Sequence, residues 1–255
     1  MSRRLPLIVL ALAGSLLAQA RGASAQVTSA PPGIDLSGFW MLRYDVSVDT
    51  IMPSGNALTG YIPPAPLTPE AARAVAAAAQ PESLRTTIPT SVGGSRWCRA
   101  QPYPFFMRSP EAIDIIQGDR QVMVTGDRIG AMRHIHLDQP THPDGWEPTI
   151  MGHVIGRWEG NTLVADTIGL AGGGIPGARA ATPRTHLVER YKLLPDGRLS
   201  ITFTWEDPTQ FTAPHTYELI YYRQPPDTYA YENFCDPSDP SQYVEPIRPA
   251  GQPAQ

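Results

Sequence analysis

Short runs of hydrophobic residues recur along most of the chain, and turn-forming residues separate them about every ten positions. The runs are rich in β-branched and aromatic residues, which is typical of strands in an all-β domain. An opening strand is expected within residues 35–44. Further strands are expected at 112–117, 121–126, 132–137, 152–158, 162–167, 185–194, 199–205, 217–223 and 228–232.

The turns between these strands predict how the strands are connected. Glu159-Gly160-Asn161 and Pro195-Asp196-Gly197 are expected to form tight hairpins. Consecutive strands joined in this way form an antiparallel meander, and closure of the meander removes its exposed edges. We therefore predict a lipocalin-like β-barrel, with a β-sandwich as the alternative. Thr68 as N-cap, followed by Pro69 and an alanine-rich stretch, adds one short N-terminal helix.

The N-terminus has the features of a signal peptide. A basic start at Arg3 and Arg4 precedes an apolar run, and small residues at 23–25 form a cleavage site. The apolar run is shorter than the roughly 20 residues that a membrane-spanning helix requires, so we expect a periplasmic or secreted protein without a membrane span. Three parts are predicted: a signal peptide (1–25), a single β-barrel domain (26–240) and a flexible tail (241–255).

Composition narrows the choice of partners. The formal net charge is -4 and the sequence contains no run of Lys or Arg, which argues against nucleic acid and anionic membranes as partners. A small molecule is the expected partner, and the oligomeric state stays open. The chain has 2 cysteines, Cys98 and Cys235, and an oxidising compartment favours a disulfide between them.

Candidate chemistry is concentrated in the middle of the chain. Side chains along a strand alternate between faces, so His153 and Arg157 share one face, and Asp166 on the next strand meets that face. If this face points into the barrel, the three side chains form a polar ligand pocket. The alternative is a solvent-exposed face or a buried Arg–Asp pair.

The preceding strand carries two histidines on one face. His134 and His136 are spaced to bind a metal ion, and zinc would need a third ligand such as His142 or His153. This interpretation corresponds to a metal-dependent hydrolase. Because cofactor-free chemistry explains the same residues with fewer assumptions, we keep the metal site as the lesser alternative.

The simpler hypothesis is acid–base catalysis. A histidine acts as general base or acid, a carboxylate orients it, and an arginine stabilises developing negative charge. This assembly suits proton abstraction next to a carbonyl, hence a lyase or isomerase without a cofactor that acts on a hydrophobic or aromatic small molecule. A lipocalin-like binding protein without catalysis is the alternative. The predicted catalytic residues are His153, His142, Arg133, Arg157, Asp138 and Asp127, and the predicted substrate contacts are Asp166, Trp158, Tyr191 and Glu189.

Several motifs resemble a widespread family of secreted, mostly uncharacterised bacterial proteins. The matching segments are Arg133-x-Ile135-x-x-Asp138, His142-Pro143, the hairpin from Gly152 to Gly160, Glu189-Arg190-Tyr191 and Asp207-Pro208. The resemblance implies a calycin-like or lipocalin-like barrel, and it implies no particular reaction. Compared with the family pattern, Asp127 stands in place of Glu, Gln139-Pro140 in place of Gly-Arg, and His215 in place of Trp. These differences imply an altered pocket.

Overall fold

The computed structural model describes residues 29–42, 62–78, 103–108, 112–126, 132–172 and 174–226. Several predicted features lie outside these residues and stay predictions. They are the signal peptide, Asp127, the Cys98–Cys235 disulfide, the strand at 228–232 and the tail after residue 240.

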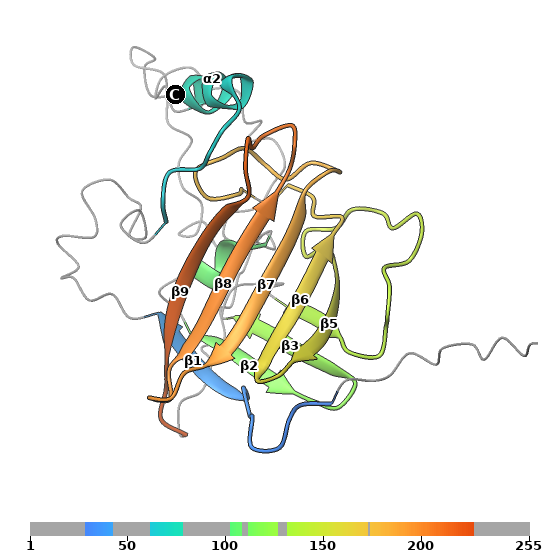
Figure 1. Cartoon of the computed structure of the whole chain (residues 1–255), viewed down its shortest axis with the longest axis vertical. Coiled ribbons are helices and arrows are strands. Elements are labelled where there is room, and N and C mark those ends of the chain that lie inside the picture. The colour runs from blue at the N-terminus through green and yellow to red at the C-terminus, as the bar shows by residue number, and fades with distance from the viewer. Residues whose placement is uncertain are drawn as a thin grey trace, which may run out of the picture.

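Nine strands form a closed barrel, so the all-β barrel prediction is confirmed (Figure 1). Each strand pairs with the next along the chain, and the first pairs with the last. The strands are β1 (Gly38–Leu42), β2 (Ile113–Gln117), β3 (Gln121–Gly126), β4 (Met132–His136), β5 (His153–Glu159), β6 (Thr162–Ile168), β7 (His186–Leu193), β8 (Leu199–Glu206) and β9 (His215–Arg223).

The two predicted hairpins join β5 to β6 and β7 to β8. Gly160 and Gly197 have φ angles of 58° and 83°, which a residue without a side chain adopts at little cost. The predicted helix is also present as α2 (Pro69–Ala78). The Thr68 hydroxyl accepts a hydrogen bond from the amide of Ala71 at 3.2 Å, as expected for an N-cap.

One junction departs from the antiparallel meander. β4 and β5 run parallel and meet at a single pair, His136 with Ile155. A parallel neighbour needs a connection that returns along the barrel, and a tight turn cannot supply it. Residues 137–152, which we call the crossover segment, provide this return.

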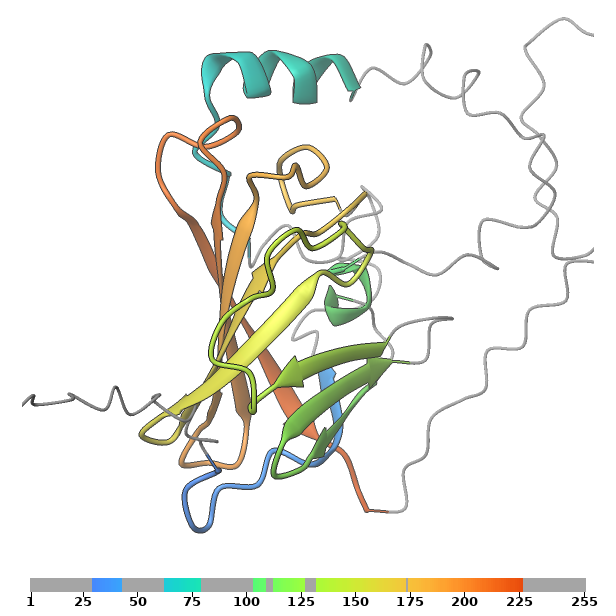
Figure 2. The same ribbon diagram turned by 90° about the vertical axis from the view of Figure 1, so that its right-hand side faces the viewer.

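Large side chains occupy the barrel interior. Alternate residues of each strand point inward, and the largest fully buried side chains include Trp40, Trp205, Phe203 and Tyr221. The segment Tyr103–Arg108, which contains the short helix η2 (Phe105–Arg108), adds Tyr103, Phe106 and Met107 to this core. Figure 2 shows η2 above the strands β2–β4, on the side of α2. Within the part of the chain that the structure describes, none of the helices has the length and hydrophobicity required to cross a bilayer.

Candidate functional site

The outer face of β5 and β6 carries the polar side chains that the sequence had suggested for a pocket. On β5, Val154 and Gly156 point inward, so His153 and Arg157 point outward. Gly156 fixes this orientation: a Cβ atom there would lie 2.5 Å from Ile135, so the strands leave no room for a side chain on the inward face. The hypothesis of an interior pocket lined by His153, Arg157 and Asp166 is therefore wrong.

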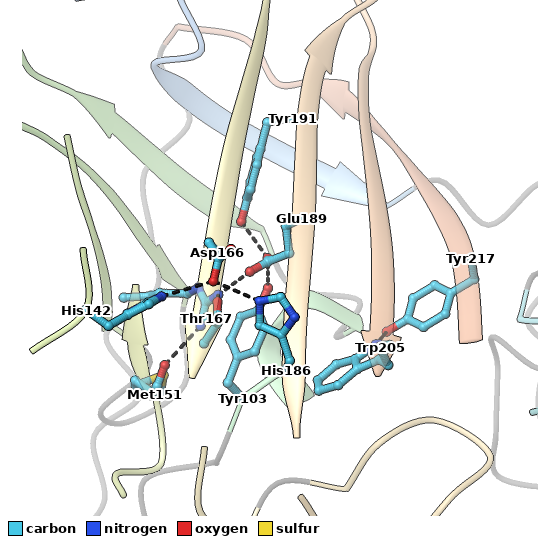
Figure 3. Close-up of polar contacts among 11 residues, drawn as sticks. Tyr103, His142, Met151, Asp166, Thr167, His186, Glu189, Tyr191, Trp205 and Tyr217 are labelled. Atoms are coloured by element: carbon cyan, nitrogen blue, oxygen red, sulfur yellow. Dashed lines mark hydrogen bonds and ion pairs between the residues drawn. The ribbon is translucent and has the colours of Figure 1, made fainter. Parts of the chain in front are cut away.

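A hydrogen-bonded series links the crossover segment to β5 and β6. His142 Nε2 lies 3.0 Å from Asp166 Oδ1, and His142 Nδ1 lies 2.8 Å from His153 Nδ1. The series Asp166–His142–His153 thus orients both imidazole rings, which is the arrangement needed for general acid–base chemistry. We call it, with His186 and Gln139, the outer cluster. Figure 3 shows the contacts of Asp166 with His142 and His186.

The series continues onto β7 and β8. His186 Nε2 lies 2.9 Å from the same Asp166 oxygen, and His186 Nδ1 lies 3.3 Å from Glu206 Oε2. Sequence reasoning assigned no role to His186. His186 and Glu189 are three residues apart on one strand, so their side chains lie on opposite faces. This alternation was the only sequence signal that separated His186 from Glu189.

Two side chains of the crossover segment enclose His153. Gln139 Oε1 lies 3.0 Å from His153 Nε2, and the Trp146 ring lies 4.6 Å from the His153 ring in an edge-on arrangement. On the other side, His136 of β4 stacks on His153 at 5.6 Å. Neither Gln139 nor Trp146 was predicted, although Gln139 is one of the departures from the family pattern.

The environment shifts the pKa values of the outer cluster in different directions. Burial lowers the pKa of His153, and the neighbouring His142 and His136 add to this effect. Burial raises the pKa of Asp166, but hydrogen bonds from His186 and His142 outweigh burial and leave that pKa below its usual value. Asp166 in turn raises the pKa of His186 through their hydrogen bond. The cluster therefore combines an ionised carboxylate with histidines that titrate on either side of their ordinary range.

A second polar cluster lies on the opposite side of the same wall, inside the barrel. Arg133 forms an ion pair with Glu189, and the hydroxyls of Tyr103 and Tyr191 donate to the other Glu189 oxygen. Arg133 also donates to Thr167 Oγ1 at 2.7 Å and to the Met151 carbonyl at 3.0 Å. We call this set the inner cluster, and Figure 3 shows it around Glu189.

The inner cluster separates residues that the sequence hypothesis had grouped together. Arg133, Glu189 and Tyr191 are fully buried, with 0% of each residue exposed, so they are not in one site with His142 and His153. Burial and the nearby Glu189 carboxylate raise the pKa of both Tyr103 and Tyr191 well above the usual value. The cluster joins the segment that contains Tyr103 to β4, the crossover segment, β6 and β7, and its two tyrosines stay protonated near neutral pH.

Most of the remaining predicted site residues lie apart from both clusters, whereas His136 stacks on His153 of the outer cluster. Arg157 pairs with Glu159 on the surface, at 2.6 Å, and Asp138 pairs with Arg120. Trp158 points inward and packs against the core. His134 and His136 share the outer face of β4, as predicted, and their rings stack at 6.4 Å. Among the described residues, no group of three His, Cys, Asp or Glu side chains is arranged to hold a metal ion.

Comparisons with known proteins do not assign the chain to a family. No protein-family model matches the chain, and no curated protein is significantly similar to it. The resemblance to secreted bacterial proteins described above therefore stays a prediction.

Proposed function

We propose that this protein is an exported acid–base enzyme, of lyase or isomerase type, that acts on a hydrophobic or aromatic small molecule without a cofactor. The observation that supports this proposal is the series Asp166–His142–His153 on the outer face of the barrel. An anchored carboxylate, an intermediate imidazole and a terminal imidazole are the groups that move a proton to and from a substrate.

His153 Nε2 is the atom that would exchange a proton with the substrate. Both nitrogens of His142 are engaged, one by Asp166 and one by His153. His153 Nε2 faces Gln139, a side chain that a substrate can displace. Burial lowers the pKa of His153, which favours the neutral ring, and in that state Nε2 has the free lone pair that a base requires.

The chemistry follows from this assignment. His153 removes a proton from a carbon next to a carbonyl, and the electron pair of the broken C–H bond moves into an enolate. In an isomerase, the enolate takes the same proton back on another carbon. In a lyase, the enolate collapses, its electron pair forms a C=C bond, the bond from the neighbouring carbon to the leaving group breaks, and the leaving group takes the proton. The positive charge that forms on the imidazoles is balanced by Asp166, which the structure holds 3.0 Å from His142. Arg133 has no part in this scheme because Glu189 engages it inside the barrel.

Trp146 supports the choice of an aromatic or hydrophobic substrate. Trp146 is 39% exposed and its ring contacts the His153 ring, so it offers an apolar face beside the proposed base. Ile150 of the same crossover segment is 36% exposed. An aromatic ligand would stack on Trp146 with its polar group directed to the histidines.

The test combines a ligand screen with two matched variants. Aromatic and terpenoid compounds are screened by thermal shift, and each ligand is then incubated with the wild type, His153→Gln and His134→Gln. We expect turnover by the wild type and His134→Gln, and a loss of at least 100-fold in His153→Gln with binding retained. His134 is the control because it is an exposed histidine on the adjacent strand β4.

Two other results would contradict the proposed enzyme and indicate a different function. Binding without turnover in all three proteins would indicate the lipocalin-like binding protein. Stoichiometric zinc in the purified protein, lost together with activity on chelation, would indicate the metal-dependent hydrolase.

We further propose export, with cleavage before Gln26. The mass of the protein recovered from the periplasm or medium of an expressing bacterium measures this directly. A protein that keeps residues 1–25 in the cytoplasmic fraction would contradict it.

A further inference from the structure

The hydrogen bonds of the outer cluster relate the number of protons on its histidines to the groups that face each ring nitrogen. His186 lies between two carboxylates, with Nε2 at 2.9 Å from Asp166 and Nδ1 at 3.3 Å from Glu206. An ionised carboxylate accepts hydrogen bonds and does not donate them. Both ring nitrogens of His186 must therefore carry a proton, and the ring is an imidazolium.

The same reasoning applies to the His142–His153 pair. One end of the pair faces the Asp166 carboxylate, at His142 Nε2, and the other faces the Gln139 carbonyl oxygen, at His153 Nε2. With the Gln139 amide in this orientation, both partners accept, so both of these nitrogens carry a proton. The contact of 2.8 Å between the two Nδ1 atoms requires one more. In this state, three ring protons on two imidazoles give the pair a single positive charge. With the Gln139 amide turned so that its NH₂ group donates to His153 Nε2, the same contacts need only two ring protons and the pair is neutral.

Charge balance favours the cationic state of the pair, whereas burial of His153 favours the neutral state. In the cationic state, two positive charges, on His186 and on the pair, face the carboxylates of Asp166 and Glu206. Release of the proton on His153 Nε2 leaves the cluster with one positive charge fewer. His136, stacked on His153, opposes a positive charge on that ring. Burial lowers the pKa of His136 itself, and the nearby Asp138 carboxylate acts against this lowering.

We infer that His142 and His153 titrate as one acid, and that Gln139 controls the proton that this pair releases through His153 Nε2. The inference rests on the proposed function for its catalytic meaning. In the cationic state, the Gln139 carbonyl oxygen accepts from His153 Nε2. After the proton leaves, that nitrogen is an acceptor, and Gln139 turns its amide so that the NH₂ group donates instead. Gln139 is thus a positioning residue that satisfies both states of the base.

The test reads ring protonation by NMR of protein labelled with ¹⁵N-histidine, so it does not depend on turnover. In the wild type, we expect the resonances of His142 and His153 to move together with a single midpoint. Gln139→Met removes the acceptor, which stabilises the cation more than the neutral pair, and lowers this midpoint by about half a pH unit. Gln139→Glu adds a carboxylate acceptor and raises the midpoint by about one pH unit or more.

Two controls separate this role from a general disturbance of structure. Gln121 makes a comparable contact of 3.3 Å with His134 on the same outer surface, so Gln121→Met is expected to leave the midpoint of the pair unchanged. His215 is buried inside the barrel with Nε2 at 3.1 Å from the Pro176 carbonyl, and its resonances report whether each variant keeps the fold.

Opposite shifts in the two Gln139 variants, with His215 unchanged, would support the inference. Independent midpoints for His142 and His153, or equal midpoints in all three proteins, would overturn it. Either result leaves the proposed enzyme intact because activity is measured separately. Conversely, a protein without turnover can still show the coupled titration.

Discussion

The inner and outer clusters lie on opposite sides of the same barrel wall, yet their charged groups differ in their access to water. On β6, Thr167 faces inward and Asp166 faces outward. On β7, Glu189 faces inward and His186 faces outward. The inner groups have no exposure, whereas the side chains of His142, Asp166 and His186 are 17%, 25% and 35% exposed and His153, beside them, is 5% exposed. Water access is therefore the main difference between a polar group that holds the fold and one that can exchange protons.

This difference has an energetic basis. Dehydrating Arg133 and Glu189 costs several kcal/mol for each ion, and their contact with each other, the tyrosine hydroxyls, Thr167 and the Met151 carbonyl offset the cost. Loss of one partner is therefore far more harmful than loss of both. In the outer cluster, solvent compensates for a lost partner, so substitutions there are expected to change titration more than stability.

The largest expected effect is on the inner cluster. Glu189→Leu leaves Arg133 buried without its counter-charge and should lower the free energy of unfolding by about 3–5 kcal/mol. Urea unfolding followed by tryptophan fluorescence measures this value. The double variant Arg133→Met, Glu189→Leu removes both charges and should be more stable than Glu189→Leu alone. A double variant less stable than the single would mean that the arginine does not depend on its partner.

A smaller effect is expected at Asp207, which is buried in neutral surroundings. Burial raises its pKa, but hydrogen bonds from Thr182, Thr209 and Thr185 outweigh burial and lower the pKa to about 2. Asp207→Asn should cost about 1–3 kcal/mol at pH 7. The wild type keeps this contribution above about pH 4 and loses it as the pH falls towards 2. The difference between the two proteins in urea unfolding should therefore shrink in acid.

The smallest effect on stability is expected in the outer cluster. Asp166→Asn should change the free energy of unfolding by about 1 kcal/mol or less, while the NMR midpoint of His186 falls. A raised histidine pKa stabilises the fold below the ordinary value near 6.5 and loses that contribution as the pH rises through the raised value. The stability difference should thus be larger at pH 5 than at pH 9. A difference that is independent of pH would argue against the His186–Asp166 ion pair.

The strands and hairpins were predictable because they depend on local signals. Every strand expected in the described residues is present, and the turns at Gly160 and Gly197 have the geometry that their sequences favour. The parallel pairing of β4 and β5 was not predicted because no local sequence signal in the crossover segment fixes where its two ends lie. Strand direction after a long connection depends on the packing of the whole barrel.

The candidate site was half predictable for a related reason. Alternation along a strand correctly grouped Arg133 with Ile135 and His153 with Arg157, but it does not say which group faces inward. Gly156 indicates which face of β5 points inward, because a glycine within a strand often marks close approach to a neighbouring strand. Gln139 and Trp146 reach His153 only through tertiary structure, and no local pattern gives their position.

The shared wall also limits how this protein can evolve. Asp166 and Thr167 are consecutive, so a one-residue insertion or deletion before them in β6 would exchange their faces, burying the carboxylate and exposing the hydroxyl. Such a change would disrupt both clusters at once. The crossover segment has no strand register to preserve, although it supplies His142, Gln139 and Trp146. Relatives with new substrate preferences are therefore expected to differ in the length and composition of this one connection while the strands keep their spacing.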